Sequence, residues 1–253
     1  MIAIIGGSGL TNLATLAVKR REVMRTPYGE PSGALTFGTL AGHDIVFLAR
    51  HGYGHTIPPH EINYRANLWA LKEAGIGQVI AVASVGGIRD YFGPGTLVVP
   101  DQIIDYSYGR KHTYFEGPDA PVTHIDFTWP YSKLLRGALL AAAQAAGETV
   151  HDGGVYGNTQ GPRLESAAEI ARLERDGCDL VGMTGMPEAA LARELGLEYA
   201  CLSVVVNHSA GKGDSAQEIS VEHLGVVMKQ AMSRVQRILE RAVAPRQHLE
   251  LSR

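Results

Sequence analysis

In Tyr199-Ala-Cys-Leu-Ser-Val-Val-Val206, apolar and β-favouring residues follow one another with no regular polar alternation. A strand that is covered by helices on both faces of a sheet has this pattern. Asn207 and the loop His208-Ser-Ala-Gly-Lys-Gly213 come directly after the run. Because an amide side chain donates and accepts hydrogen bonds at once, we expect a binding site where this strand ends.

Other segments extend this pattern along the chain. Short apolar runs predict strands at residues 2–5, 45–48, 79–85 and 97–99. Longer periodic or Ala/Leu-rich runs predict helices at residues 61–74, 131–146, 187–195 and 221–243. The mixture of strands and helices predicts an α/β fold. We expect one domain over residues 1–244, a flexible tail at 245–253, and an excursion from the core at 110–129.

The composition narrows the class of protein. The 253 residues permit one large domain or two small ones, and the 45% apolar content is ample for a core. A formal net charge of −3 does not favour nucleic acid as a partner. Cys178 and Cys201 match no metal spacing, which favours a reducing compartment. The first residues lack signal-peptide features and no apolar run has membrane-spanning length, so we expect a soluble cytoplasmic protein.

A glycine-rich turn, Gly6-Gly-Ser-Gly9, follows the first predicted strand. Its backbone N–H groups and the Ser8 hydroxyl are suited to hold an anion. A plain connecting turn is the second reading, and a dinucleotide-binding turn is the third. The third reading is the weakest, because the G-x-G-x-x-G spacing is absent.

Arg50 and His51 follow the strand predicted at residues 45–48. The guanidinium offers a planar fork for a phosphate, and the imidazole offers a second donor. The alternative is a solvated loop. His55 and His60 also raise the question of a metal site, but no acidic or Cys ligand has a diagnostic spacing, so no metal is expected.

Three more loops carry candidate ligand-binding side chains. Ser84 lies in Val82-Ala-Ser-Val-Gly-Gly-Ile88, where the glycines permit close approach of a ligand or form a simple bulge. Glu165 precedes a predicted helix and either caps it electrostatically or binds a ligand. Met183 and Thr184 either pack and cap locally or contact a sugar and an anion. Because ligands gather at strand carboxyl ends in α/β sheets, the loops together predict one site.

A longer motif carries a family resemblance. Arg50-His-Gly52 followed by His55-Thr-Ile-Pro-Pro-His-Glu-Ile-Asn-Tyr-Arg-Ala-Asn-Leu-Trp-Ala-Leu-Lys-Glu-Ala-Gly75 closely resembles the methylthioadenosine phosphorylase branch of the trimeric purine nucleoside phosphorylases. Gly182-Met-Thr-Gly-Met-Pro-Glu188 and Gly6-Gly-Ser-Gly9 fit the same branch. The resemblance implies one α/β domain with a mixed, partly barrel-like central sheet flanked by helices. It also implies a homotrimer with active sites near the subunit contacts.

The resemblance further implies roles for individual residues. The positions that match phosphate ligands are Ser8, Arg50, His51, Ser84 and Thr184. Met183 matches the residue that packs on the ribose, and Asn207, His208 and Ser209 match the purine-binding stretch. His124 matches a histidine that is lent to the neighbouring subunit's sugar pocket. Inorganic phosphate is then a co-substrate, and neither a metal nor an organic cofactor is implied.

Two departures from that branch and one feature shared with it decide the expected substrate. Its members typically carry aspartates at the positions of Asn207 and Ser209, where a carboxylate accepts from a 6-amino purine. They usually have serine at Glu165, whereas a glutamate is typical of inosine and guanosine phosphorylases and accepts from purine N1–H. Those latter enzymes have a histidine for the sugar 5′-hydroxyl, and this chain offers Val221 instead. Leaving a buried hydroxyl unpaired costs roughly 1–3 kcal/mol, so Val221 suits a methylthio group better.

Together these residues predict phosphorolysis of 5′-methylthioinosine to hypoxanthine and 5-methylthioribose 1-phosphate. Asn207 would be the catalytic residue that donates to purine N7, while Glu165 and Val221 would set specificity. The nearest alternatives are a methylthioadenosine phosphorylase and an inosine/guanosine phosphorylase. A non-catalytic nucleotide-binding protein, an oxidoreductase and a hydrolase are alternatives from other classes.

Overall fold

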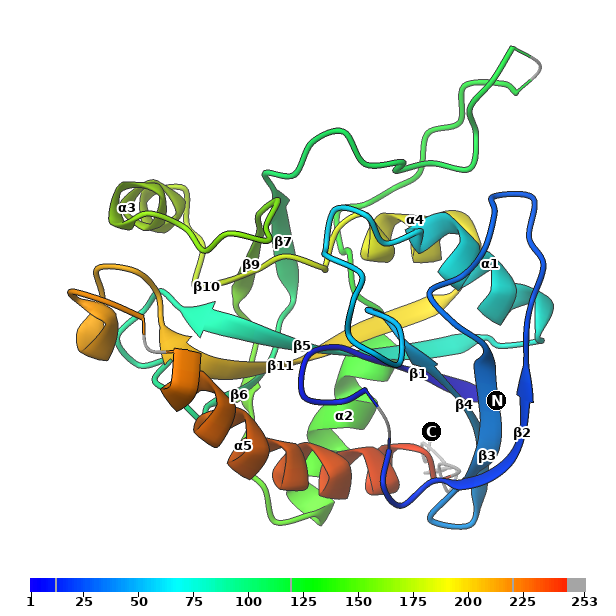
Figure 1. Cartoon of the computed structure of the whole chain (residues 1–253), viewed down its shortest axis with the longest axis horizontal. Helices are drawn as coiled ribbons and strands as arrows, with labels where there is room; N and C mark the ends of the chain where they lie inside the picture. Colours follow the sequence, from blue (N-terminus) through cyan, green and yellow to red (C-terminus); the bar gives the residue numbers. More distant parts are fainter. Residues whose placement is uncertain (12, 119, 220, 245–253) are drawn as a thin grey trace, which may run out of the picture.

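The computed structural model describes residues 1–11, 13–118, 120–219 and 221–244, without the side chains of 221–223. The predicted tail at 245–253 lies outside these residues. One mixed, 11-stranded sheet forms the centre of the chain, with helices around it (Figure 1). The strands are β1 (Ile2–Gly6), β2 (Ala17–Glu22), β3 (Leu35–Leu40), β4 (His43–Ala49), β5 (Gln78–Gly87), β6 (Leu97–Val99), β7 (Gln102–Asp105), β8 (His151–Asp152), β9 (Val155–Asn158), β10 (Leu180–Gly182) and β11 (Glu198–His208).

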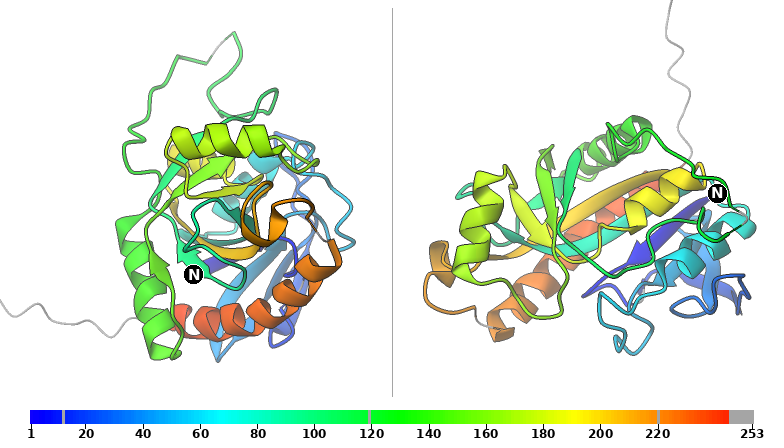
Figure 2. Two further views of the ribbon diagram at one scale, coloured as in Figure 1. Left: turned by 90° about the vertical axis from the view of Figure 1, so that its left-hand side faces the viewer. Right: turned by 90° about the horizontal axis from the view of Figure 1, so that it is seen from above.

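The sheet closes on itself at one end. β5 pairs in parallel with β11 along its length and in antiparallel fashion with β10 at its end. β11 pairs with β6, which continues into β7, while β8 continues into β9. β6 pairs with β8, β7 with β9, and β9 with β10, so the ring of neighbours returns to β5. This partial barrel is visible end-on in the left view of Figure 2 and confirms the predicted sheet.

Two layers of helices cover the faces of β5 and β11. On one face, α2 (Lys133–Ala145) and α5 (Val221–Ala242) pack with Leu202 and Val204 of β11. On the other face, α1 (Tyr64–Glu73) and α4 (Glu188–Glu194) pack with Cys201 and Val205. Successive side chains of β11 therefore enter opposite cores, as its continuous apolar run predicts. Burial of each Leu or Val side chain contributes about 1.5–3 kcal/mol.

A smaller apolar cluster closes the barrel end. α3 (Ala167–Arg175) places Ile170 and Leu173 against Cys178, Val181 and Ile88. The helix begins at Ser166, whose side chain accepts from Glu169 N while the Glu169 carboxylate accepts from the Ser166 backbone. This capping box satisfies the first backbone N–H groups of the helix.

All five predicted strands and all four predicted helices are present, with shifts at their ends. The helix predicted from residue 61 begins at Tyr64, because the Asn63 side chain accepts a hydrogen bond from Ala66 N and forms the N-cap. Several strands were not predicted. These are β2, β3 and β7–β10. β2 is exposed along its whole length and rich in charge, and β7–β10 are only two to four residues long, so none of these five has a readable apolar period.

Candidate active site

A cavity of about 280 Å³ lies where the parallel strands β1, β4, β5 and β11 end. Neighbouring parallel strands present their carboxyl ends at the same edge of a sheet, so the loops that follow them meet there. Most of the predicted site residues line this cavity. They are Ser8, Arg50, His51, Ser84, Glu165, Met183, Thr184, Asn207 and Ser209.

Met183 and Thr184 reach the cavity through the antiparallel pairing of β10 with β5. Val181 lies opposite Gly86, and Leu180 lies opposite Gly87. Continuing this register carries the residues after β10 towards Ser84, so the Met183 and Thr184 loop faces the end of β5. The structure thus brings together loops that are far apart in sequence.

A β-bulge in β11 brings two successive residues to the same cavity. The register with β5 shifts between Val205 and Asn207, which pairs with Gly86, so Val206 is the extra residue. Successive strand residues normally face opposite sides, but here both Val206 and Asn207 line the cavity. The bulge therefore turns the Asn207 amide towards the site. Asn207 Nδ2 donates to the His208 carbonyl oxygen at 2.5 Å, which uses one of its two N–H groups.

The Ser209 hydroxyl is a buried polar group at the cavity wall. Ser209 is 2% exposed, and its Oγ has no hydrogen-bond partner within the part of the chain that the structure describes. A Cβ on Gly86 would lie 2.7 Å from this oxygen, so the wall accepts only glycine there without a shift. Because buried hydroxyls are nearly always paired in folded proteins, the Ser209 hydroxyl remains available for a hydrogen bond at the cavity wall.

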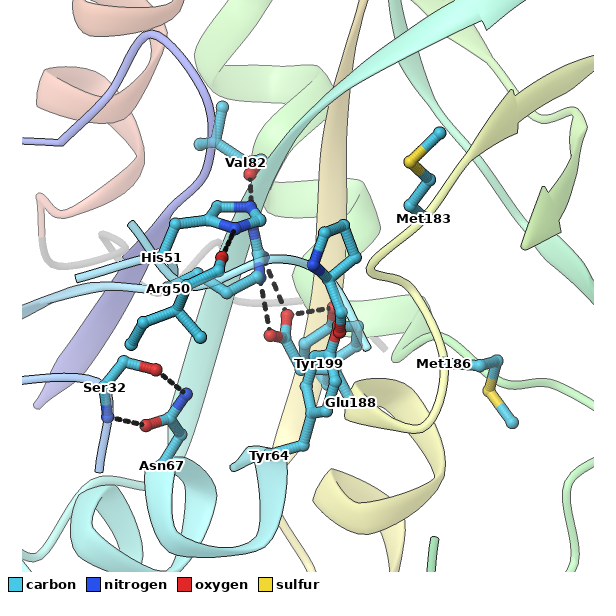
Figure 3. Close-up of polar contacts among 12 residues, drawn as sticks. Ser32, Arg50, His51, Tyr64, Asn67, Val82, Met183, Met186, Glu188 and Tyr199 are labelled. Carbon is cyan, nitrogen blue, oxygen red and sulfur yellow. Dashed lines mark hydrogen bonds and ion pairs between the residues drawn. The ribbon is translucent and has the colours of Figure 1, made fainter. Parts of the chain in front are cut away.

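Arg50 is held by a buried carboxylate that the sequence analysis did not identify. Its Nε and Nη2 donate to the Glu188 carboxylate at 2.7 and 2.8 Å, and Nη1 donates to the Val82 carbonyl oxygen at 2.9 Å (Figure 3). The Tyr199 hydroxyl also donates to Glu188, at 2.8 Å. Burial opposes the charge of Arg50, yet the Glu188 carboxylate holds its pKa above the ordinary value. Of the five N–H donors of a guanidinium, two remain for a ligand.

From the sequence, Glu188 is only the last residue of the motif Gly182–Glu188, near the start of a predicted helix. The structure gives it a different role, since its side chain is completely buried. Nothing in the local pattern Met186-Pro-Glu188 distinguishes a buried glutamate from the exposed ones that are common at helix starts. Its partner, Arg50, is remote in sequence, so the pairing could be found only from the fold.

His51 is neutral and presents an acceptor to the cavity. Its Nδ1 lies 2.8 Å from the Ile57 carbonyl oxygen, which only accepts, so Nδ1 carries the proton. Burial and then the charge of Arg50 lower the His51 pKa to about 4. Nε2 therefore has no proton near neutral pH. In this state Nε2 offers an acceptor; a bound anion would raise the pKa of His51 and favour the donor role predicted from the sequence.

The depressed pKa of His51 predicts a pH-dependent stability. A group with a lower pKa in the folded state contributes stability that is present above its unfolded value and lost as the pH falls through the folded value. Between pH 6.5 and pH 4 the protein should lose about 3 kcal/mol of unfolding free energy through this residue. Urea unfolding across this range measures it. His51→Gln should flatten the dependence of the unfolding free energy on pH, whereas His60→Gln, at an exposed position, should leave it unchanged. The same pH dependence in both variants would contradict the role of His51.

Glu165 is available to a ligand rather than to the following helix. Its Oε1 accepts from the Thr159 hydroxyl at 2.5 Å. The hydrogen-bonded capping box of α3 is built by Ser166 and Glu169, so Glu165 is not needed for a hydrogen bond to the start of this helix. Glu165 lines the cavity with one carboxylate oxygen already oriented by Thr159.

One wall of the cavity is apolar. Ile219, Leu224 and Met228, from the start of α5 and the segment before it, line it together with Val206. The predicted contribution of Val221 cannot be located in the same way, because its side chain lies outside the described residues. The sequence analysis did not identify Ile219, Leu224 or Met228.

His208 and His124 are not brought to this cavity. The His208 ring packs beside Gly213, its Nδ1 accepts from Asp214 N at 3.3 Å, and the residue does not line the cavity. His208 contributes its carbonyl oxygen to Asn207 instead. His124 is exposed on the long segment between β7 and α2, which extends away from the sheet (Figure 1).

Across residues 1–244 without 12, 119 and 220, no group of three or more His, Cys, Asp or Glu side chains is arranged to hold a metal ion. Within the same residues, none of the helices combines the length and apolar character required to cross a bilayer.

Known proteins resemble this chain over nearly its whole length. A sequence profile described as the phosphorylase superfamily matches residues 1–244. A protein of Pseudomonas syringae pv. tomato named probable S-methyl-5′-thioinosine phosphorylase is 54% identical over 242 residues, covering 96% of this chain and 98% of that protein. The 6-oxopurine nucleoside phosphorylase of Pyrococcus furiosus is 47% identical over 215 residues, covering 83% and 80% of the two chains.

A solved structure resembles the fold closely. Methylthioadenosine phosphorylase from Schistosoma mansoni, in complex with adenine, superposes with a TM-score of 0.91 at 31% sequence identity. The superposition covers 96% of this chain and 90% of that one. The predicted α/β fold with a mixed central sheet and flanking helices is thereby confirmed.

Proposed function

Because the chain belongs to the phosphorylase superfamily, we propose that it catalyses phosphorolysis of 5′-methylthioinosine. The products are hypoxanthine and 5-methylthioribose 1-phosphate, as expected for a pentosyltransferase of purine salvage. One observation carries the proposal: the same cavity is lined by an amide, a glutamate and a set of apolar side chains. The name of the Pseudomonas syringae relative supports the same substrate.

The purine end of the cavity suits a 6-oxopurine. Asn207 is able to donate to N7, and Glu165 is able to accept from N1–H, which a 6-aminopurine lacks. The Ser209 hydroxyl is buried at the same wall and is suited to complete the contacts with the base. A carboxylate in place of Asn207 would accept from a 6-amino group and repel a developing negative charge.

The sugar end suits a methylthio substituent. Ile219, Leu224 and Met228 offer only apolar contacts, and Met183 faces the same space to pack on the ribose. A 5′-hydroxyl held there without a partner would cost about 1–3 kcal/mol, so inosine should react less well than its methylthio analogue.

The phosphate end lies at the turn after β1 and the loop after β4. We assign phosphate to the two remaining N–H groups of Arg50 and to Ser8, Ser84 and Thr184, with His51 Nε2 as an acceptor from a protonated oxygen. The charge of Arg50 is permanent, and its fork is oriented in advance by Glu188. Such an arrangement binds an anion without reorganisation during the reaction.

The reaction then proceeds by transfer of the sugar from purine to phosphate. The glycosidic bond lengthens first, leaving positive charge on the sugar and the bonding electrons on the purine. Asn207 donates to N7 as this negative charge develops, an interaction that strengthens in the transition state. A phosphate oxygen forms the new bond to the anomeric carbon with inversion as the bond to the purine nitrogen breaks. The proton that hydrogen phosphate loses ends on the purine, which leaves as neutral hypoxanthine. Holding both substrates side by side supplies much of the rate.

The proposed enzyme needs phosphate as co-substrate and no cofactor, and acts in the cytoplasm without nucleic acid or membrane partners. Its two cysteines are buried and unpaired, which supports a reducing compartment. We further propose a homotrimer in which exposed His124 reaches the neighbouring subunit's sugar pocket. Exposed Val122 and Trp129 on the same segment support its use as an interface.

A substrate panel tests the function directly. Methylthioinosine, methylthioadenosine, inosine, guanosine and adenosine are each incubated with and without phosphate, and release of free base is measured. The proposal predicts phosphate-dependent release, fastest from methylthioinosine. Preference for methylthioadenosine would refute the argument from Asn207, and release without phosphate would indicate a hydrolase. The second candidate function is phosphorolysis of inosine or guanosine. It is supported by the name of the Pyrococcus furiosus relative, 6-oxopurine nucleoside phosphorylase.

A further inference from the structure

Arg110 is a buried cation beside the cavity that contacts neither of the proposed substrates. It is 9% exposed and begins the segment that the sequence predicts to leave the core. Its guanidinium donates to four backbone carbonyl oxygens: Met183 at 2.9 Å, Met186 at 2.5 Å, Thr159 at 3.3 Å and Gln160 at 2.8 Å. The guanidinium therefore holds together two loops that are remote in sequence, one at residues 159–160 and one at residues 183–186.

The first of these loops carries the sugar and phosphate contacts. Met183 and Met186 flank Thr184, and both lie on the turn between β10 and α4 (Figure 3). Arg110 Nη1 binds the carbonyl oxygens on either side of Thr184. The backbone N–H of Met186 is bound in turn by Asn158 Oδ1 at 3.1 Å. The turn is therefore supported from two sides, and its path determines where Met183 and Thr184 face the cavity.

The second loop carries the purine contact. Arg110 Nη2 binds the carbonyl oxygens of Thr159 and Gln160, and Nε lies 3.3 Å from Gln160 Oε1. The Thr159 hydroxyl donates to Glu165 at 2.5 Å. The position of Glu165 at the cavity thus depends on a loop that Arg110 holds.

Arg110 also contacts a third part of the cavity wall, through the side chain of Tyr64. Arg110 Nη1 lies 3.4 Å from the Tyr64 hydroxyl, which donates to the Pro59 carbonyl oxygen at 2.9 Å. Pro59 lines the cavity. Among the described residues, no carboxylate forms an ion pair with Arg110, so its charge is balanced chiefly by oriented carbonyl groups.

We propose that Arg110 is the positioning residue that fixes the purine, sugar and phosphate walls relative to one another. The proposal rests on the function proposed above. A guanidinium is suited to this task because its five donors have a rigid planar arrangement, whereas an ammonium has three on a flexible stem. Loss of Arg110 releases two loops at once and displaces all three substrate contacts.

Kinetics of Arg110→Met tests the role. The value of kcat/KM for methylthioinosine should fall about 100-fold, as misplacement of substrate contacts predicts. KM should rise for phosphate and for the nucleoside, and the preference over methylthioadenosine should decrease as Glu165 loses its support. Arg110→Lys keeps the charge but offers fewer donors. Its kcat/KM and KM values should therefore lie between those of the unmodified protein and those of Arg110→Met. If Arg110→Met does not fold, the two KM values of Arg110→Lys test the role instead: a rise in both supports it, and unchanged values contradict it.

A matched control separates positioning from general stability. Arg136 also donates to two backbone carbonyl oxygens, of Pro100 and Val99, but neither of these residues lines the cavity, and Arg136 pairs with Asp152 as well. Arg136→Met should leave both KM values and the substrate preference unchanged. The positioning role is overturned if Arg110→Met lowers only kcat, in proportion to the folded fraction.

A binding measurement distinguishes failure of this inference from failure of the proposed function. If the unmodified protein releases no base from any nucleoside of the panel, the proposed function fails. The shift in melting temperature caused by inorganic phosphate then tests Arg110 by itself. Arg110→Met should lose this shift and Arg136→Met should keep it; a shift retained in Arg110→Met refutes the inference.

Discussion

Glu188→Gln should destabilise the folded protein by about 3–5 kcal/mol, the cost of removing one partner of a buried ion pair. Arg50 is 1% exposed and stays charged at any accessible pH, so the variant would leave its charge without a counterion. An amide also has only one acceptor oxygen where Glu188 accepts from Arg50 twice and from Tyr199 once. Urea unfolding at neutral pH measures the loss as a lower midpoint.

The same substitution at the surface provides the control. Glu22 pairs with Arg20 at 3.4 Å, with both side chains about half exposed, so Glu22→Gln should cost less than about 1 kcal/mol. Equal losses in the two variants would show that the burial of Glu188 has no energetic consequence. The double variant Arg50→Met/Glu188→Gln removes the unpaired charge and should recover part of the stability, without recovering phosphate binding.

Asn207→Asp should lower kcat/KM for methylthioinosine by about 10²–10³, the usual effect of removing one donor to a developing anion. A carboxylate only accepts, so it cannot donate to N7 of the leaving purine. It is able to accept from a 6-amino group, so the activity on methylthioadenosine should rise relative to that on methylthioinosine. Initial rates of base release from both nucleosides, at saturating phosphate, measure this ratio.

Asn63→Asp is the matched control for this change of charge. Asn63 is the N-cap of α1, where aspartate is an equally good cap, and it does not line the cavity; the aspartate loses only the hydrogen bond from Nδ2 to the Tyr28 carbonyl oxygen. The ratio of the two nucleosides should therefore stay constant in Asn63→Asp. An unchanged ratio in Asn207→Asp as well would remove Asn207 from the specificity argument. Activity of Asn207→Asp on methylthioinosine should increase as the pH falls, because a protonated carboxyl regains a donor.

Features that depend on one continuous segment of the chain were predictable from the sequence. The unbroken run that ends at Val206 predicts a strand covered on both faces, and Leu202 and Val205 do enter opposite cores. Polar residues just after such strands, among them Ser8, Arg50 and Asn207, were predicted to share one site, and all three line the cavity. The rule that strand ends meet at one edge is sufficient for this inference.

What depends on pairing between distant segments was not predictable. Glu188 shows its role only beside Arg50, and the orientation of Asn207 depends on a bulge that is defined by the register with β5. The proton position on His51 depends on the Ile57 carbonyl oxygen. β2 escaped prediction because its residues are all exposed, which leaves no apolar side to read.

The pairing of β5 with β11 also bears on when the site comes into existence during folding. Gln78 lies beside Glu198, and every strand between them in the chain must be placed before the ring of neighbours closes. Contacts between such distant residues form late and slow the search for the native state. A partly folded chain therefore has the individual loops but no binding competence. Substrates recognise only the finished molecule, and by binding it they protect it from unfolding.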